Sequence, residues 1–298
     1  MLGSMELSGL YVPLITPFTD DDRLDPEALA TLVTTVLDQG AAGVIALGTT
    51  GEPATLTREE ARQVVNVCVQ ICAERDRHLI VGAGSNNTAA SADMLTEVDA
   101  RATAALVVVP YYTRPSQDGV VQHFQHLSAA TDVPFIVYNI PYRTGVTLTA
   151  ETLHRLADLP TVIGFKHTVG SIDDITIAFM SEARPDVAVL AGNDLYAGPL
   201  IALGARGAIM ASANLATHAY AELIRAWQEG SADRARVLHN KLVPLTRAFF
   251  TEPNPAVIKA VLAAQGRIPS PRVRLPLLTA TQPAVDTALE YLRSALTD

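Results

Sequence analysis

Cysteine is scarce in this sequence, and so are long apolar runs. Only two of the 298 residues are cysteines, Cys68 and Cys72, and they lie four positions apart in a helical pattern. Two thiols make no disulfide framework, so we expect a reducing compartment and a cytoplasmic location. No apolar segment reaches the ~18 residues that a membrane-spanning helix needs. The start, Met1-Leu2-Gly3-Ser4-Met5, lacks a basic region followed by an apolar stretch, and we expect no signal peptide.

Positive charge is also in short supply. The chain has 22 Lys and Arg against 31 Asp and Glu, which gives a formal net charge of −9. Phosphate backbones and anionic lipids repel such a chain, so we expect neither nucleic acid nor a membrane surface as a partner. A small anion can still bind in a local basic pocket.

Short apolar runs recur along the first two thirds of the chain. They are rich in β-branched residues, nearly free of polar residues, and bounded by Gly, Pro or Asp. Strands buried on both faces of a parallel sheet have this composition. The runs span residues 11–15, 43–47, 79–82, 105–109, 134–138, 162–165, 187–190 and 207–210.

Helical patterns separate these runs. Thr57, followed three residues later by Glu60, predicts a capping box at the start of one helix, and Ser116 and Asp173 stand where two more begin. Eight strands alternating with helices predict a (β/α)8 TIM barrel over residues 1–216, with an open doubly wound sheet as the alternative. Residues 217–298 hold only helical patterns and predict a C-terminal helical region.

Polar residues follow several of the predicted strands. In a barrel the carboxyl ends of all strands meet at one mouth, where active sites lie. We therefore expect hydroxyls, one amine and one guanidinium to converge there. The segments concerned are 48–52, 110–115, 138–145, 166–168 and 192–194.

Lysine is informative because the chain has only three, at positions 166, 241 and 259. Lys241 and Lys259 fall in helical segments of the tail, where we expect ordinary solvated amines. Lys166 instead follows an apolar strand. Burial lowers the pKa of an amine, and a neutral amine attacks carbonyls, which suggests a Schiff-base lysine. A structural ion pair with a carboxylate is the alternative.

Other candidates surround this lysine. Tyr138, one strand away, can relay protons or simply fill the core, and Thr50 and Tyr112 can extend a relay or serve as turn and packing residues. Arg143 suits a carboxylate, with a solvated surface arginine as the alternative. Thr49 and Thr50 offer a carboxylate cradle. No dinucleotide fingerprint, P-loop or metal-ligand set is evident, so we expect no cofactor and no metal.

Together these segments resemble the dihydrodipicolinate synthase/N-acetylneuraminate lyase superfamily of lysine-dependent barrel enzymes. The resemblance runs from about Leu10 to Leu277. Two further segments, 110–115 and 141–145, look like the dihydrodipicolinate synthase branch. The motifs that carry the resemblance are Gly48-Thr49-Thr50-Gly51-Glu52, Tyr138-Asn139-Ile140-Pro141, Gly164-Phe165-Lys166, Gly192-Asn193-Asp194, Asn254-Pro255 with Lys259, and Arg274-Leu275-Pro276-Leu277.

The resemblance implies a role for each site residue. Lys166 would form an imine with pyruvate, and Tyr138 would relay protons to it. Thr50 would link Tyr138 to Tyr112, which an adjacent subunit supplies. The remaining residues would bind substrate: Thr49 and Thr50 at the pyruvate carboxylate, Gly192 and Ile209 lining the pocket, and Arg143 at the second substrate.

The implied reaction condenses pyruvate with L-aspartate-4-semialdehyde to 4-hydroxy-tetrahydrodipicolinate, in lysine and diaminopimelate biosynthesis. The implied assembly is a homotetramer, a dimer of dimers. His167 stands where this branch commonly has an acidic residue, and a His-Thr pair there is found in other branches, which motivates a different second substrate. Ala90 occupies the place of a carboxylate used in lysine inhibition, so we expect weak inhibition by lysine or none. Two alternatives stay open: a pyruvate-dependent aldolase or dehydratase of a keto-deoxy sugar acid or sialic acid, and a non-catalytic carboxylate-binding barrel.

Overall fold

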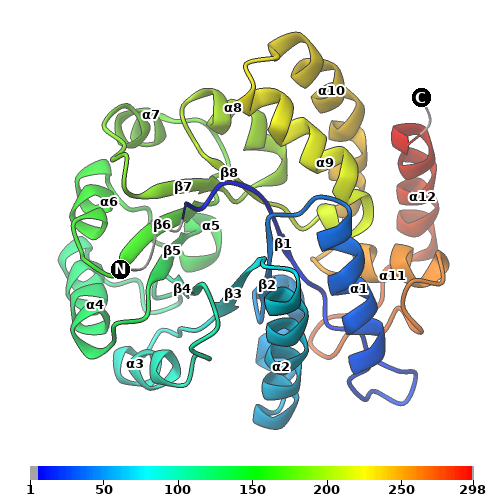
Figure 1. Cartoon of the computed structure of the whole chain (residues 1–298), viewed down its shortest axis with the longest axis horizontal. Helices are drawn as coiled ribbons and strands as arrows, with labels where there is room; N and C mark the ends of the chain where they lie inside the picture. The colour runs from blue at the N-terminus through cyan, green and yellow to red at the C-terminus, as the bar shows by residue number, and fades with distance from the viewer. Residues whose placement is uncertain (1–5, 297–298) are drawn as a thin grey trace. The chain divides into compact units, whose positions relative to one another are not determined.

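Eight parallel strands close into a barrel, and they follow one another around it in sequence order (Figure 1). The computed structural model describes residues 6–296, so the five N-terminal residues that bear on a signal peptide lie outside the described part. The predicted (β/α)8 barrel with a helical extension is confirmed, and the open sheet is wrong. The strands are β1 (Gly9–Pro13), β2 (Gly43–Ala46), β3 (His78–Gly82), β4 (Ala104–Val108), β5 (Phe135–Asn139), β6 (Val162–His167), β7 (Ala188–Ala191) and β8 (Gly207–Ile209).

Helices connect the strands and then continue alone after β8. The barrel helices are α1 (Pro26–Asp38), α2 (Arg58–Glu74), α3 (Thr88–Thr96), α4 (Gln117–Ala130), α5 (Pro141–Thr144), α6 (Ala150–Ala157), α7 (Asp174–Ser181) and α8 (Ala197–Ala202). Three short 3-10 helices are η1 (Thr49–Gly51), η2 (Pro53–Thr55) and η3 (Asp194–Tyr196). The extension comprises α9 (Ala213–Gln228), α10 (Ala232–Phe249), α11 (Ala256–Ala264) and α12 (Gln282–Leu296). None of the helices in residues 6–296 combines the length and apolarity that crossing a membrane requires.

The predicted helix starts are present. The Thr57 hydroxyl accepts from the Glu60 N–H while the Glu60 carboxylate accepts from the Thr57 N–H, which is a complete capping box at α2. Ser116 caps α4 through the Gly119 N–H, and Asp173 caps α7. These local hydrogen bonds satisfy N–H groups that the first helical turn would otherwise leave unpaired.

Contacts within the chain divide it into two compact units. The first comprises Met1–Gly9 and Ile80–Ile209, and it contains β4 to β8. In its sheet, β5 pairs with β6 so that Tyr138 is the direct neighbour of Lys166, and Lys166 in turn pairs with Leu190 of β7. Side chains of these strands are almost all buried, as the unbroken apolar runs predicted.

The second unit comprises Leu10–Leu79 and Met210–Asp298. In it α9, α10, α11 and α12, coloured yellow to red in Figure 1, pack on one another, and α9 also contacts α1. Helix α9 kinks at Ala216, whose backbone is not helical (φ −128°, ψ 49°). The predicted boundary between 1–216 and 217–298 falls at this kink and stays a prediction.

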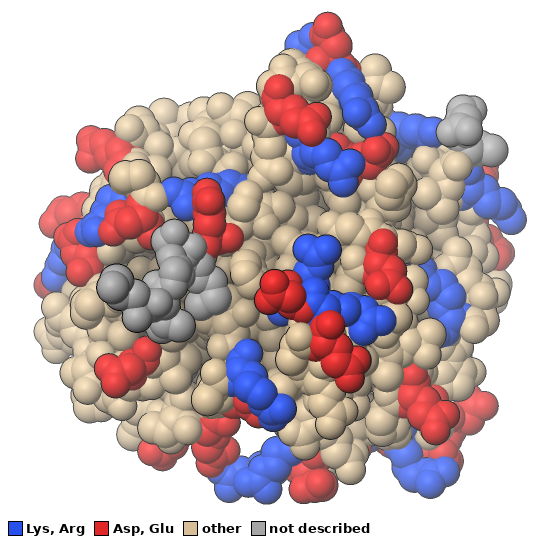
Figure 2. Space-filling view, viewed as in Figure 1, with Lys and Arg blue, Asp and Glu red and all other residues tan. Residues whose placement is uncertain are grey.

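Charged side chains of both signs are interspersed on the face drawn in Figure 2. Among the described residues of this face, acidic groups lie next to most of the basic ones. An extended basic patch of the kind that binds a phosphate backbone is therefore not formed there.

Candidate active site

Lys166 lies near the carboxyl end of β6 with only 6% of its surface exposed. The residues that precede it in β6, Val162 to Phe165, are apolar, and the strand is covered on both faces, so the amine lies in a largely dry environment. The Nζ atom lies 4.3 Å from the centre of the Tyr138 ring, and Tyr138 is itself buried. The two residues that sequence placed on neighbouring strands are thus in contact.

Burial controls the charge on this amine. It lowers the pKa of Lys166 to about 8, against a smaller raising effect of Asp194, while Arg143 lowers it further. Within residues 6–296 Lys166 forms no ion pair with a carboxylate. With this pKa roughly one molecule in ten carries a neutral amine at pH 7. The structural ion pair is thus not formed among the described residues, and the nucleophilic role of the amine stays a prediction.

Asp194 is the acidic group whose charge reaches Lys166. It lies on η3, directly after β7, and is 6% exposed. The sequence pointed to the end of β7 but did not single out this carboxylate. Because it favours the charged amine, Asp194 keeps the pKa of Lys166 from falling further.

Gly192 is required by close packing. A Cβ atom at this position would lie 1.8 Å from the Thr168 Oγ1 atom and 2.9 Å from the Lys166 Cγ atom. Thr168 is buried, and its hydroxyl has no hydrogen-bond partner in the described part of the chain. Glycine therefore leaves room for the Lys166 stem on one side and for Thr168 on the other.

Arg143 and Tyr142 lie on α5, a single helical turn that starts directly after β5. Pro141 at the first position and Gly145 with φ 73° at the end define this single turn. The Arg143 guanidinium is exposed and lies 5.9 Å from the Tyr142 ring centre. A group so displayed can bind a carboxylate that arrives from solvent.

Tyr112 lies between β4 and α4 and is 88% exposed. Its backbone is left-handed (φ 69°), as is that of Arg114 (φ 50°). Such conformations are uncommon for non-glycine residues and cost on the order of 1–3 kcal/mol each. The loop therefore holds the Tyr112 phenol away from its own unit.

His167 points to the other side of β6. Its Nδ1 atom lies 3.2 Å from the Asn139 Nδ2 atom, and its Nε2 atom lies 3.3 Å from the Thr176 Oγ1 atom of α7. Burial lowers the pKa of His167 to about 4, so the ring is neutral at physiological pH. His167 thus joins a strand to a helix and does not face the amine of Lys166.

Ile209 is the last residue of β8 and is buried. Among the described residues, no group of three or more His, Cys, Asp or Glu is arranged to hold a metal ion.

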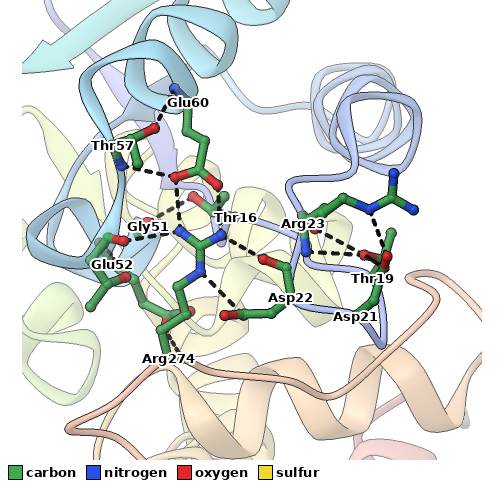
Figure 3. A network of polar contacts seen from close by, with 11 residues as sticks. Thr16, Thr19, Asp21, Asp22, Arg23, Gly51, Glu52, Thr57, Glu60 and Arg274 are labelled. Atoms are coloured by element: carbon green, nitrogen blue, oxygen red, sulfur yellow. Dashed lines mark hydrogen bonds and ion pairs between the residues drawn. The ribbon is translucent and has the colours of Figure 1, made fainter.

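Thr49 and Thr50 form the start of η1, directly after β2 in the second unit. A hydrogen bond holds the backbone of η1 in place: the Thr16 hydroxyl donates to the Gly51 carbonyl oxygen at 2.7 Å (Figure 3). Thr50 is 4% exposed, and its Oγ1 atom accepts a hydrogen bond from the Asn254 amide nitrogen at 3.0 Å. The sequence did not predict this contact from the C-terminal region.

Glu52 ends the turn in a left-handed conformation (φ 55°) and forms a buried ion pair. Its Oε1 atom lies 2.8 Å from the Lys259 Nζ atom, and its Oε2 atom accepts from the Arg274 backbone N–H at 3.0 Å. Both charged side chains are almost fully buried. The expectation that Lys259 is a solvated amine is therefore wrong, because α11 is covered on all sides.

Arg274 forms further hydrogen bonds with the segments around this turn. Its guanidinium donates to the Glu60 carboxylate at 2.6 Å and 2.9 Å and to Asp22 (Figure 3). It also donates to the Thr55 carbonyl oxygen at 2.9 Å. The bonds that Arg274 donates to Glu60 hold the pKa of this carboxyl down at about 2. The Phe18 ring lies 4.0 Å from the Lys259 Nζ atom and 4.1 Å from the Arg274 guanidinium carbon. The C-terminal region thus fixes the turn that carries Thr49 and Thr50.

A buried amine at the carboxyl end of a strand, in a closed (β/α)8 barrel, is the arrangement of a barrel lyase that works through a lysine. The sequence model of the dihydrodipicolinate synthetase family matches residues 6–295. The chain belongs to this family and is a lyase of it. The resemblance found in the sequence is thereby confirmed.

Individual relatives agree with this assignment. The 4-hydroxy-tetrahydrodipicolinate synthase of Methanothrix thermoacetophila is 38% identical over 97% of this chain and 96% of its own. The dihydrodipicolinate synthase structure from Thermotoga maritima is 35% identical, with a TM-score of 0.93, over 97% of this chain and 98% of its own. The Acinetobacter baumannii enzyme, solved with pyruvate, is 33% identical, with a TM-score of 0.93, over 97% and 99%. The reaction of the family is the formation of 4-hydroxy-tetrahydrodipicolinate.

Proposed function

We propose that this enzyme condenses pyruvate with L-aspartate-4-semialdehyde through an imine on Lys166. The observation that carries the proposal is the state of that amine: it is buried, lowered in pKa to about 8 and free of any ion pair within residues 6–296. A neutral amine in a dry site is the nucleophile that a 2-oxo acid requires.

The first half of the reaction builds a carbon nucleophile. The Lys166 amine adds to the pyruvate carbonyl carbon, and the resulting carbinolamine loses water to give the imine. The imine withdraws electrons from the methyl group, which then loses a proton to form an enamine. Tyr138, whose ring lies against the amine, is the group we assign to these proton transfers.

The second half uses the other substrate. The enamine carbon attacks the aldehyde carbon, whose oxygen takes up a proton. The substrate's own amine then attacks the imine carbon and releases Lys166. Overall, one water molecule leaves and the cyclic product 4-hydroxy-tetrahydrodipicolinate forms.

The remaining site residues bind the substrates. Following the resemblance, we assign the binding of the pyruvate carboxylate to Thr49 and Thr50, and we assign a substrate-lining role to Gly192 and Ile209. Arg143 is exposed and forms no ion pair among the described residues, which supports its assignment to the carboxylate of the second substrate. A single-turn helix placed directly after β5 keeps this guanidinium near the end of the strand.

Tyr112 is assigned to the relay of a neighbouring subunit. Its 88% exposure and left-handed backbone support this assignment, because a large aromatic side chain held out in this way offers a contact surface for a second copy. The homotetramer and the cytoplasmic location remain proposals. One similar structure is of a monomeric dihydrodipicolinate synthase variant, so the assembly is best measured by light scattering.

No specific observation favours the alternative substrates. His167, which motivated a sugar-acid aldolase, lies against Thr176 of α7 and not beside the amine. The other alternative, a non-catalytic carboxylate-binding barrel, predicts a protein that binds a carboxylate without turning over any substrate.

Product formation tests the proposal. The purified chain is mixed with pyruvate and L-aspartate-4-semialdehyde, and the product is followed by NMR beside a Lys166→Ala variant. We expect the cyclic product with wild-type protein and none with the variant. Turnover of sugar-acid aldehydes, but not of aspartate semialdehyde, would refute the proposal.

A further inference from the structure

We propose that Asn254 is a positioning residue of the active site, whose amide fixes the direction in which the Thr50 hydroxyl gives its proton. Asn254 lies just before α11, 204 positions from Thr50. The inference rests on the proposed function, because it takes Thr50 to act on substrate or in the proton relay.

The contact has a defined polarity. The Asn254 Nδ2 atom donates to the Thr50 Oγ1 atom at 3.0 Å. A hydroxyl has one proton and two lone pairs, and an amide nitrogen can only donate. One lone pair of Thr50 is therefore occupied, and its proton must find an acceptor elsewhere.

That acceptor is not a protein group of the second unit. The Asn254 bond is the only side-chain hydrogen bond of Thr50 among the described residues, although Thr50 is 4% exposed. Buried hydroxyl protons are normally satisfied. The proton of Thr50 is thus kept for an oxygen of the substrate or of the proton relay.

The other polar atom of the Asn254 side chain is left unsatisfied. Its own Oδ1 atom is buried without a hydrogen-bond partner in residues 6–296. A buried acceptor that is left without a hydrogen bond destabilises the folded state. Orphaned polar atoms of this kind call for an explanation, and the fixed orientation of Thr50 supplies one.

The fold does not need the Asn254 bond to hold the turn. The backbone of the turn is already fixed by the Thr16 hydroxyl at Gly51 and by the two bonds to the Glu52 carboxylate. What these bonds leave undetermined is the rotation of the Thr50 O–H. Asn254 is the neighbour that determines it.

The test reverses the direction of the hydrogen bond between residue 254 and Thr50 without changing the shape of the side chain at position 254. In Asn254→Asp the new carboxylate can only accept, so it takes the Thr50 proton for itself. The matched control is Asn66→Asp, which adds the same charge at an exposed position on α2. The readout is the exchange of pyruvate methyl protons for deuterium, followed by NMR, because this exchange needs the imine and the relay but not the second substrate.

We expect Asn254→Asp to slow the exchange roughly 10- to 100-fold, since positioned proton transfer contributes ~10²–10⁴-fold. Asn66→Asp should exchange like wild type. In a Thr50→Val background, which has no hydroxyl to orient, Asn254→Asp should have no further effect. A merely structural role would instead give additive losses in the two backgrounds.

Two results would overturn the inference alone: wild-type exchange in Asn254→Asp, or additive effects with Thr50→Val. Wild-type protein that forms no borohydride-stable adduct with pyruvate would instead overturn the proposed function and this inference with it. Should Asn254→Asp fail to fold, Asn254→Ala carries the same cycle, with an expected loss of roughly 2- to 10-fold that again vanishes in Thr50→Val.

Discussion

Glu52 and Lys259 lie 207 positions apart, yet their charged atoms are 2.8 Å apart and both side chains are almost fully buried. This pair ties the turn after β2 to α11, in the extension that follows the barrel. The C-terminal helices of the second unit are therefore part of the support of the turn that carries Thr49 and Thr50.

Breaking this pair should unfold the protein more easily. Glu52→Gln leaves the Lys259 amine buried without a counter-charge, and removal of one partner from a buried pair typically costs ~3–5 kcal/mol. Denaturant unfolding measures the loss. The matched control is Glu59→Gln on the exposed side of α2, which should change stability by less than about 0.5 kcal/mol. Equal effects of the two substitutions would show that the pair adds little.

Removing the Lys166 amine should stabilise the protein while abolishing activity. The folded-state pKa of Lys166 is about 8 and its ordinary value is 10.5, so between these values the unfolded chain holds a proton that the folded chain has lost. The buried amine therefore lowers the free energy of unfolding most below pH 8, and this destabilisation disappears as the pH rises toward 10.5.

The comparison is Lys166→Met against wild type in denaturant at several pH values. At pH 7 we expect the variant to be more stable by up to about 3 kcal/mol, and we expect the difference to vanish near pH 10.5. A variant that is less stable than wild type at pH 7 would show that the buried amine does not destabilise the folded protein.

Gly192→Ala should damage the site through a clash that a second substitution relieves. The added methyl would lie 1.8 Å from the Thr168 Oγ1 atom, and overpacking of this kind typically costs ~1–3 kcal/mol. The Gly192→Ala, Thr168→Ala double variant should recover part of the stability and activity. Unfolding and product assays measure both. If the double variant is no better than the single one, Thr168 is not the obstacle.

Lysine should inhibit the enzyme weakly or not at all. Ala90, in the first turn of α3, has no carboxylate to offer an amino group. Activity is measured over a lysine series with norleucine as the control. A steep fall at modest lysine concentrations, absent with norleucine, would contradict this prediction.

The strands were predictable because each is buried on both faces. Every apolar run in the sequence overlaps one strand of the barrel, since nothing polar interrupts a strand that has no solvent side. Lys166 stood out for the same reason, as an amine at the end of such a run. The helix starts at Thr57, Ser116 and Asp173 were predictable because capping is local in sequence.

The contacts made by the C-terminal region were not predictable. Asn254 gives no signal in the sequence that connects it with Thr50, and helical periodicity does not tell what covers a helix. Lys259 did carry a signal, because apolar residues surround it from Ala256 to Leu262, and every one of them is buried. An amine inside an all-apolar helix should have been expected to be paired.

The two buried lysines allow the most direct test of the central claim. Burial lowers the pKa of both Lys166 and Lys259 to about 8, but in the described part of the chain only Lys259 is paired with a carboxylate. The protein is incubated with pyruvate and borohydride, digested and mapped by mass spectrometry. We predict reduced pyruvate on the peptide that contains Lys166 and none on the peptide that contains Lys259. An unmodified Lys166 peptide, or labelling of both lysines alike, would contradict the account.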